Sequence, residues 1–312
     1  MIPCKASWTA ELIRLALRPL LRRGAPGSPP GIGAHVRKEL GGYERWVLPP
    51  PRRFETGETV LGGVPASFVG GIGAANEPHI LFLHGGGYAA GSPTLYRHIT
   101  WRFAAAAGAR VIAPDYRLAP EHPYPAALDD GLAAWREFVT SGGAPGRCAF
   151  VGDSAGGGLA LALALRLRDE GGPLPGAIVA ISPWTDLAVT GDSAAPGASD
   201  PLLNAGDLQP IAAQYLAGTD PRTPYASPLY GDLRGLPPTL IQVGSDEILL
   251  DDSLRMAERM RVAGCDVTLE VWPRMPHVWH AFAPLLPEAR MAIAHVGAFV
   301  REKTGETPRY SN

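Results

Sequence analysis

The 312-residue sequence is long enough for one large domain or two smaller ones, with room for a sizeable core. Hydrophobic residues make up 46% and charged residues 19%, which is ordinary for a globular protein. A disordered chain is therefore not expected. The formal net charge of −2 offers no basic field for nucleic acid, so small molecules are the expected partners.

The N-terminal segment, residues 8–23, has the pattern of an amphipathic helix. Glu11, Arg14 and Arg18 interrupt its apolar side chains, so a secretory signal is not expected. No stretch of the chain reaches the about 20 apolar residues that a membrane-spanning helix needs. We expect this helix to pack on the protein's own body; the alternative is that it lies on a membrane surface.

Short apolar runs alternate with helical patterns along most of the chain. Eight runs are predicted to be strands, at residues 46–48, 66–69, 79–84, 110–114, 148–152, 177–182, 239–244 and 267–272. The clearest helical patterns cover residues 95–107, 126–140, 159–170, 253–263 and 287–302. Several runs are apolar throughout, as parallel strands covered on both faces are. The alternation predicts an α/β fold with a mainly parallel sheet and helices on both of its sides.

Two stretches fit this alternation poorly. Residues 1–45 combine the N-terminal helix with a Gly/Pro-rich run, and residues 186–222 are rich in small residues, with one helical pattern at 208–216. We expect both to form a small cap over the C-terminal edge of the sheet, which would shape a pocket and exclude water. Residues 46–185 and 223–312 would then form the α/β core. The alternative is that the two stretches are surface decoration.

The strongest chemical signal is the sequence Gly-Asp-Ser-Ala-Gly at residues 152–156. A Gly-x-Ser-x-Gly pattern between an apolar strand and a helix is typical of a nucleophile turn. The turn is so sharp that a Cβ at either glycine position would collide with neighbouring backbone. It projects the Ser154 hydroxyl from the sheet edge, next to the positive end of a helix. A phosphate-binding loop is the alternative, but it would need Lys where this chain has Leu159.

A run of three glycines follows His84, directly after an apolar strand. Because glycine lets backbone N–H groups approach a substrate closely, this arrangement is typical of an oxyanion-binding loop. The N–H of Ala155, just after the nucleophile, is the expected third donor. Each fixed donor of this kind is worth about 2.7–4 kcal/mol when it is removed by mutation.

Three histidines follow Ser154 and are candidates for the base that a serine nucleophile needs. His277 comes after the last predicted strand, in a loop that can bring it over the sheet edge, and is the predicted base. His280 is the second choice, whereas His295 lies inside a helical pattern. His277 and His280 could instead bind a metal, but no third ligand is placed nearby.

The acid is expected after the preceding strand, because the usual chain order is Ser, then Asp or Glu, then His. Asp246 is the first carboxylate beyond the strand at 239–244, and we predict that it orients His277 and stabilises its charged form. Glu247 is the next choice, with Asp251 behind it. Charge at residues 251–252 is also favourable at the start of a helix.

Taken together, these motifs resemble the hormone-sensitive lipase family of esterases within the α/β-hydrolase fold. The matching pieces are the loop at 84–88, the sequence Tyr-Arg-Leu-Ala-Pro-Glu at 116–121, the turn at 152–157, Asp246 and His277. They span roughly residues 79–285. The Asp before the nucleophile is similar to the branch of the family that carries the Gly-Asp-Ser-Ala-Gly turn.

The resemblance implies a central, mostly parallel eight-stranded sheet flanked by helices, with a small helical cap. It implies Gly86 and Gly87 as oxyanion donors, a pocket for short acyl chains, no cofactor, and often a homodimer through the last strand. One departure is Pro273-Arg274, where the family often has glycine or a small or acidic residue. Arg117 and Glu121 are expected to pair, because an unpaired buried charge is costly.

The expected activity is therefore hydrolysis of short-chain acyl esters, a small-molecule substrate, by a Ser154, Asp246 and His277 triad through an acyl-enzyme. A lactone, acetylated-metabolite or amide hydrolase would use the same machinery with a different pocket. A non-catalytic binding protein on this scaffold, as the plant gibberellin receptors illustrate, should lack a triad member, and this chain lacks none.

The three cysteines, Cys4, Cys148 and Cys265, cannot all pair within one chain, and their spacing matches no zinc pattern. We interpret them as reduced thiols, which favours a cytoplasmic location. No metal site is expected.

Overall fold

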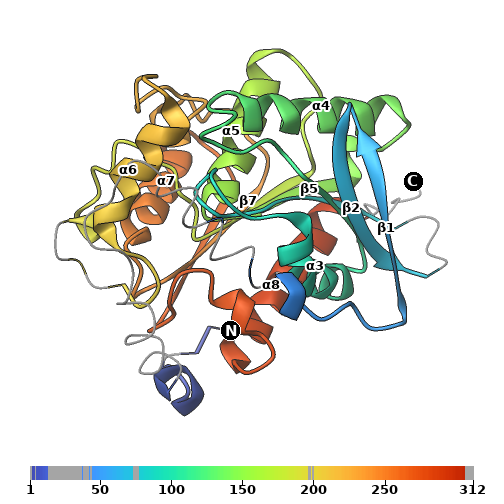
Figure 1. Ribbon diagram of the computed structural model, residues 1–312, viewed down its shortest axis with the longest axis horizontal. Helices are drawn as coiled ribbons and strands as arrows, with labels where there is room; N and C mark the ends of the chain where they lie inside the picture. The colour runs from blue at the N-terminus through green and yellow to red at the C-terminus, as the bar shows by residue number, and fades with distance from the viewer. Residues whose placement is uncertain are drawn as a thin grey trace, which may run out of the picture.

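The computed structural model describes residues 2–3, 5–12, 37, 42, 44–72, 77–195, 198 and 200–305. A single eight-stranded sheet runs through its centre, with helices on both faces (Figure 1). The strand order is β1-β2-β4-β3-β5-β6-β7-β8. β1 and β2 are antiparallel to their neighbours, whereas the six strands from β4 to β8 run parallel. The predicted α/β-hydrolase architecture is confirmed.

The strands are β1 (Phe54–Leu61), β2 (Val64–Gly71), β3 (His79–Leu83), β4 (Arg110–Pro114), β5 (Cys148–Asp153), β6 (Ala177–Ile181), β7 (Thr239–Gly244) and β8 (Val267–Trp272). The longer helices are α3 (Pro93–Ala107), α4 (Ala126–Thr140), α5 (Ala155–Asp169), α6 (Ala205–Leu216), α7 (Leu250–Val262) and α8 (Pro287–Thr304). Short 3-10 turns are η1 (Glu44–Trp46), η2 (Pro145–Arg147), η3 (Asp192–Ala194), η4 (Pro228–Tyr230) and η5 (Trp279–Phe282).

Seven of the eight predicted strands are confirmed, but the strand at 46–48 is wrong. Residues 44–46 instead form the turn η1, which the Ser92 hydroxyl holds through Glu44. Strand β1 was not predicted, because its polar residues face solvent and it contains no apolar run. Its Gly57 lies under the Phe68 ring, where an added Cβ would come within 2.7 Å of ring carbons.

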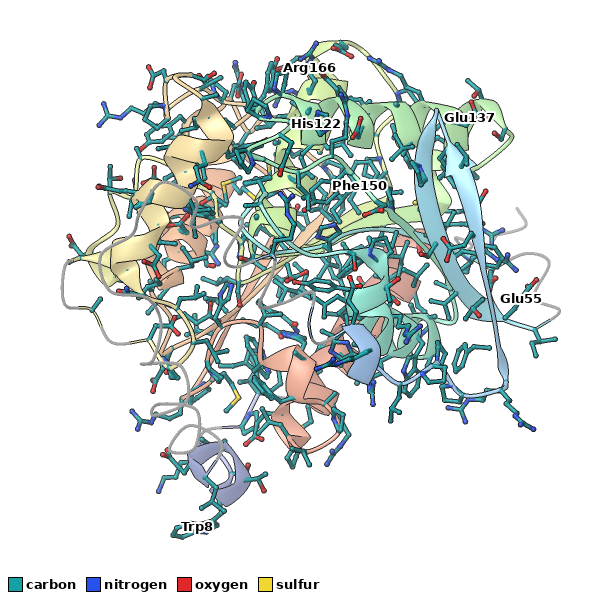
Figure 2. The ribbon with its side chains drawn as sticks, viewed as in Figure 1. Trp8, Glu55, His122, Glu137, Phe150 and Arg166 are labelled. Atoms are coloured by element: carbon teal, nitrogen blue, oxygen red, sulfur yellow. The ribbon has the colours of Figure 1, made fainter. Side chains whose placement is uncertain are left out.

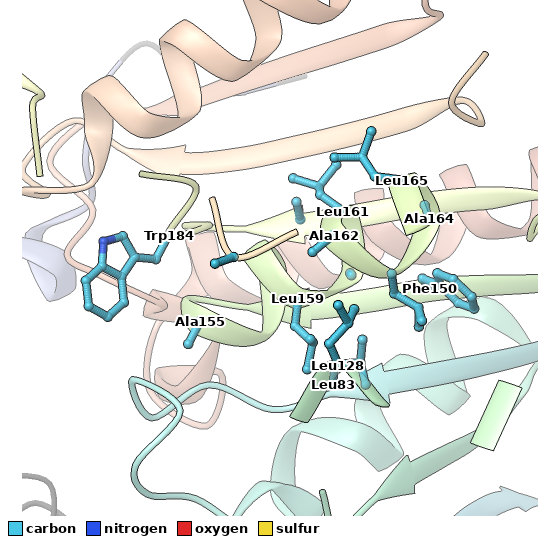
Figure 3. Close-up of a cluster of buried hydrophobic side chains, with 14 of the residues drawn as sticks. Leu83, Leu128, Phe150, Ala155, Leu159, Leu161, Ala162, Ala164, Leu165 and Trp184 are labelled. Atoms are coloured by element: carbon cyan, nitrogen blue, oxygen red, sulfur yellow. The ribbon is translucent and has the colours of Figure 1, made fainter. Parts of the chain in front are cut away.

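The core lies on both faces of the sheet, because successive side chains of a strand point to opposite sides. Phe150 of β5 packs with α4, α5 and α7 on one face, and its neighbour Val151 packs with α3 and α8 on the other. Figure 3 shows part of the first cluster, where Leu83 and Leu128 lie beside Leu159 of helix α5. Each such side chain contributes about 1.5–3 kcal/mol through burial. Apolar side chains therefore pack against both faces of β5, the strand that precedes Ser154.

The described part of the N-terminal segment attaches to α8. The backbone N–H and the hydroxyl of Ser7 both donate to Glu288, at 2.6 and 3.0 Å. Trp8 projects outward and is 89% exposed, in contrast to buried Phe150 (Figure 2). The rest of the predicted helix, residues 13–23, lies outside the described residues. In the described part of the chain, no helix combines the length and apolarity needed to cross a membrane.

Two of the three cysteines lie in the described ranges, and both are free thiols. Cys148 is buried in β5, and burial raises the pKa of its thiol to about 12. Cys265 is half-buried between α7 and β8. Cys4 lies outside the described residues. The pairing state of Cys148 and Cys265 agrees with the expected reduced thiols, while the cytoplasmic location stays a prediction.

Candidate active site

Ser154 occupies a strained turn between β5 and α5. Its φ of 54° and ψ of −123° lie where non-glycine residues are rarely found, at a cost on the order of 1–3 kcal/mol. A Cβ on Gly152 would lie 2.2 Å from the Gly156 carbonyl oxygen, and one on Gly156 would lie 2.0 Å from the Leu83 carbonyl oxygen. Both flanking positions therefore require glycine, as the sequence indicated.

The turn is held in place by the neighbouring strand β6 and the segment that follows it. The Ser154 N–H donates to the Ile181 carbonyl at 2.8 Å, and the Ser154 carbonyl accepts from the Trp184 N–H at 2.9 Å. These bonds fix the backbone on both sides of the Ser154 side chain. The hydroxyl is therefore presented at the carboxyl end of the parallel strands, where active sites of open α/β sheets lie.

Asp153, the residue before the nucleophile, ties this turn to the glycine loop after β3. Its Oδ1 accepts from the Gly85 N–H at 3.0 Å, and its Oδ2 accepts from the Tyr96 hydroxyl at 3.0 Å. Burial raises the pKa of Asp153 to about 6. No role was predicted for Asp153, although an Asp directly before the nucleophilic serine is visible in the sequence.

The glycine loop leaves two backbone donors available. Gly86 and Gly87 have φ values of 114° and 64°, which L side chains rarely adopt. Among the described residues, the N–H groups of Gly86 and Gly87 donate to no other group, whereas that of Gly85 is used by Asp153. The Ala155 N–H, in the first turn of α5, has no intrahelical acceptor. The three N–H groups named from the sequence are thus free to bind an oxyanion.

The segment at 116–121 supports the glycine loop, but its charges pair differently from the expectation. The Tyr116 hydroxyl donates to the His84 carbonyl at 2.6 Å, and the two rings stack at 4.2 Å. The predicted Arg117–Glu121 pair is wrong. Arg117 binds Asp130 at 2.7 Å, and Glu121 binds Arg37 at 2.8 Å. Arg117 is 49% and Glu121 54% exposed, so neither needs the other to avoid a buried charge.

His277 lies in the loop after β8, buried, with a carboxylate at hydrogen-bond distance. Its Nδ1 is 2.9 Å from Glu247 Oε2. The other oxygen of Glu247 accepts from the Ser182 hydroxyl and the Gly244 N–H, each at 2.7 Å. Burial alone lowers the pKa of His277, but the hydrogen bond and the charge of Glu247 outweigh it and raise that pKa. Glu247 therefore orients the imidazole and favours its protonated form.

The prediction of Asp246 as the carboxylate beside His277 is wrong. The Asp246 side chain turns away, with Oδ2 3.4 Å from Arg274 Nη1 and Oδ1 accepting from the Ser245 hydroxyl at 3.1 Å. The reason lies in the turn after β7. The Gly244 N–H and the Ser182 hydroxyl both donate to Glu247, whose side chain is long enough to reach back to them. Glu247 was the second choice from the sequence.

The remaining candidates have other partners. His280 Nε2 is 2.8 Å from Gln242 Oε1, and burial lowers the pKa of His280 to about 3. His295 Nδ1 contacts Glu270 at 2.8 Å. Asp251 accepts from the Ser193 N–H at 2.9 Å. In the described ranges, no group of three His, Cys, Asp or Glu side chains could hold a metal ion.

The end of β6 links the nucleophile to the base. The Ile181 carbonyl accepts a hydrogen bond from the Ser154 N–H. The next residue, Ser182, makes two hydrogen bonds on the side of the site that holds His277. The Ser182 hydroxyl donates to Glu247 at 2.7 Å and accepts from the Val278 N–H at 3.2 Å. The turn that carries Ser154 and the loop that carries His277 are thus anchored at adjacent residues.

The chain is similar to known proteins over most of its length. The family model described as the α/β-hydrolase fold matches residues 80–281. An acetyl-hydrolase of Streptomyces hygroscopicus is 54% identical over 228 residues, which cover 73% of this chain and 76% of that protein. An esterase of Acinetobacter venetianus is 39% identical and covers 70% of this chain and 73% of its own.

Solved structures extend the similarity over nearly the whole chain. The crystal structure of an esterase from the bacterial hormone-sensitive lipase family has a TM-score of 0.86 at 43% identity, covering 96% of this chain and 99% of that one. An esterase/lipase from an uncultured bacterium has a TM-score of 0.88 at 39% identity, with coverage of 96% and 100%. The chain therefore belongs to the α/β-hydrolase fold family, as a carboxylesterase of the hormone-sensitive lipase family.

Proposed function

We propose that the protein hydrolyses carboxylic esters with short acyl chains through an acyl-enzyme formed on Ser154. The observation that carries the proposal is the buried pair of His277 and Glu247, joined at 2.9 Å, anchored next to the turn of Ser154. A serine hydroxyl is a weak nucleophile at its ordinary pKa, and an imidazole oriented by a carboxylate is the base that activates it.

In the first step, His277 takes the proton of Ser154 Oγ as this oxygen bonds to the ester carbonyl carbon. The carbonyl oxygen becomes an oxyanion, which accepts from the N–H groups of Gly86, Gly87 and Ala155. Glu247 stabilises the imidazolium ion through Nδ1. No hydrogen bond joins Ser154 to His277 among the described residues, and the proposed mechanism requires one to form when substrate binds.

In the second step, the bond from the carbonyl carbon to the alcohol oxygen breaks, and His277 gives its proton to the leaving alkoxide. A water molecule then loses a proton to His277 and attacks the acyl carbon. The carboxylic acid is released, and Ser154 regains its proton. Atoms and charge balance with no cofactor.

Within short acyl chains, we propose acetyl esters as the first class to test. A relative with 54% identity bears the name acetyl-hydrolase, and so does the putative acetyl-hydrolase LipR of Mycobacterium tuberculosis, at 39% identity. Lactones, acetylated metabolites and amides would use the same groups. A panel of acetyl, butanoyl and octanoyl esters with matched lactones and anilides separates these classes by their kcat/KM values.

Ser154→Ala tests the assignment of the nucleophile. We expect kcat on p-nitrophenyl acetate to fall by about 10⁶-fold, with an unchanged circular dichroism spectrum. Ser67→Ala, which removes a hydroxyl on β2 that contacts Glu58, is the matched control and should keep full activity. A loss of kcat in Ser154→Ala no larger than that in Ser67→Ala would refute the proposal.

Three further expectations stay proposals. Residues 1–45 and 186–222 form the cap; helix α6 is in the second stretch, and most of the first, beyond helical residues 8–12, lies outside the described residues. The protein forms a homodimer through β8, an edge strand of the sheet. It works in the cytoplasm. Size-exclusion chromatography with light scattering, and fractionation of the source cells, would test the last two.

A further inference from the structure

Helix α6 sits directly on the glycine loop that carries the proposed oxyanion donors. The ring of Tyr215, near the end of α6, stacks on the ring of Tyr88 with centroids 3.8 Å apart and planes 6° apart. The Tyr124 N–H donates to the Tyr215 carbonyl at 2.7 Å, which fixes the helix end. Both rings are buried. The position of α6 over this loop is therefore set by close packing.

One residue of α6 covers the open side of Gly87. A Cβ added to Gly87 would lie 2.9 Å from the Cγ2 methyl of Ile211, so no other atom separates this methyl from the loop backbone. Leu208 and Ala212 on the same helix are buried, whereas Ile211 is only half-buried. Ile211 thus keeps accessible apolar surface next to one of the proposed oxyanion donors.

The topology decides which part of a substrate meets this methyl group. β3, which precedes the glycine loop, and β6 lie on opposite sides of β5, and β7 and β8 follow beyond β6. The leaving group must face His277 to receive its proton, on the β7 and β8 side. The oxyanion faces Gly86 and Gly87, on the β3 side. The remaining substituent of the reacting carbon is the acyl chain, which lies away from His277 and so on the side of Gly87, where Ile211 makes its close approach.

We infer that Ile211 is a specificity-determining residue, whose side chain limits the length of the acyl group that the site accepts. The inference rests on the proposed function and names the residue that restricts the substrate. A branched side chain is stiff about χ1, and Tyr215 one turn further along α6 holds the helix against the loop. Displacement of the Ile211 methyl by a long acyl chain therefore costs free energy.

Substitution of Ile211 tests the inference through the ratio of kcat/KM for p-nitrophenyl hexanoate to that for p-nitrophenyl acetate. Ile211→Ala should raise this ratio by about tenfold or more, since one extra or missing methylene in an apolar pocket gives about 10- to 200-fold discrimination. Ile211→Phe should lower it. Gln209→Ala, at an exposed position of the same helix, is the control and should leave the ratio unchanged.

A second series varies the alcohol and keeps the acetyl group, from ethyl to hexyl acetate. The acyl-side assignment requires that Ile211→Ala leave this profile unchanged. A shift in the alcohol profile, or an equal change for acetyl and hexanoyl esters, would overturn the inference, because a disturbed oxyanion loop would affect all esters alike. A wild-type acyl profile in both variants would overturn it too. Failure of the proposed function itself would be detected separately, as a kcat of Ser154→Ala that stays close to that of the wild type.

Discussion

The loops after β3 and β5 depend on glycines in close backbone contact, with added side-chain bonds from Asp153 and Tyr116, whereas the loops after β7 and β8 meet around the buried carboxylate of Glu247. On the nucleophile side, glycines let carbonyl oxygens approach to distances at which a Cβ would clash, as at Gly152 and Gly156. On the base side, Glu247 is buried with three hydrogen-bond donors, one of which is His277. The first half of the site is therefore sensitive to added volume, and the second to removed charge.

Among the changes that test this comparison, removal of the Glu247 charge should have the largest effect. Glu247→Gln keeps the volume but allows the wrong tautomer of His277, so kcat should fall by roughly 10⁴-fold, as for the equivalent change in other triads. Asp246→Asn, one residue away, removes the negative charge that faces half-exposed Arg274 and should change kcat by less than about twofold. Steady-state kinetics of both variants decides between the two carboxylates. A large loss of kcat in Asp246→Asn with a small loss in Glu247→Gln would identify Asp246 as the acid instead.

Added volume on the nucleophile side should have the next largest effect. The Cβ of Gly86→Ala would lie 2.2 Å from the Ala90 carbonyl oxygen, so the loop must shift and its N–H leaves the oxyanion. Loss of one donor lowers kcat by about 10²–10³-fold. Gly63→Ala is the matched control, because Gly63 also has a positive φ, of 83°, but open space around it. Similar losses of kcat in both variants would rule out the steric explanation.

The link between nucleophile turn and glycine loop should have a smaller effect. Asp153→Ala leaves the buried Gly85 N–H without its acceptor, at a cost of about 1–3 kcal/mol. We expect kcat to fall by roughly tenfold and Tm to drop by several degrees. Tyr96→Phe removes only the second bond to Asp153 and should lower Tm less. An unchanged kcat in Asp153→Ala would mean that the loop keeps its shape without this bond.

The pH dependence gives the smallest shift. Activity requires neutral His277, and Glu247 raises the pKa of this residue above its ordinary value of about 6.5. The acid limb of kcat/KM should therefore have its midpoint above this value, with activity lost as the pH falls through it. Glu247→Gln removes the strongest raising influence and keeps the lowering effect of burial, so its residual activity should have an acid limb at lower pH than the wild type. A limb that does not move would exclude His277 as the group observed.

The same contrast explains what could be predicted from the sequence. The nucleophile turn and the glycine loop were readable because only glycine fits those positions, so residue type and place are fixed together. Asp246 and Glu247 are adjacent and chemically alike, and the choice between them depends on a side chain distant in sequence, the Ser182 hydroxyl. Likewise, the parallel strands were found from their apolar runs, while the half-exposed β1 was not. The contact of Ile211 with Gly87 has no sequence signal, because it joins two segments far apart in the chain.

Labelling with a fluorophosphonate, followed by peptide mapping, tests the central claim most directly. This reagent modifies a serine only where a base and an oxyanion site activate it. The account predicts one label per chain, on Ser154, that is absent in Ser154→Ala and much slower in Glu247→Gln but not in Asp246→Asn. A folded protein that remains unlabelled, or is labelled at another serine, would contradict it.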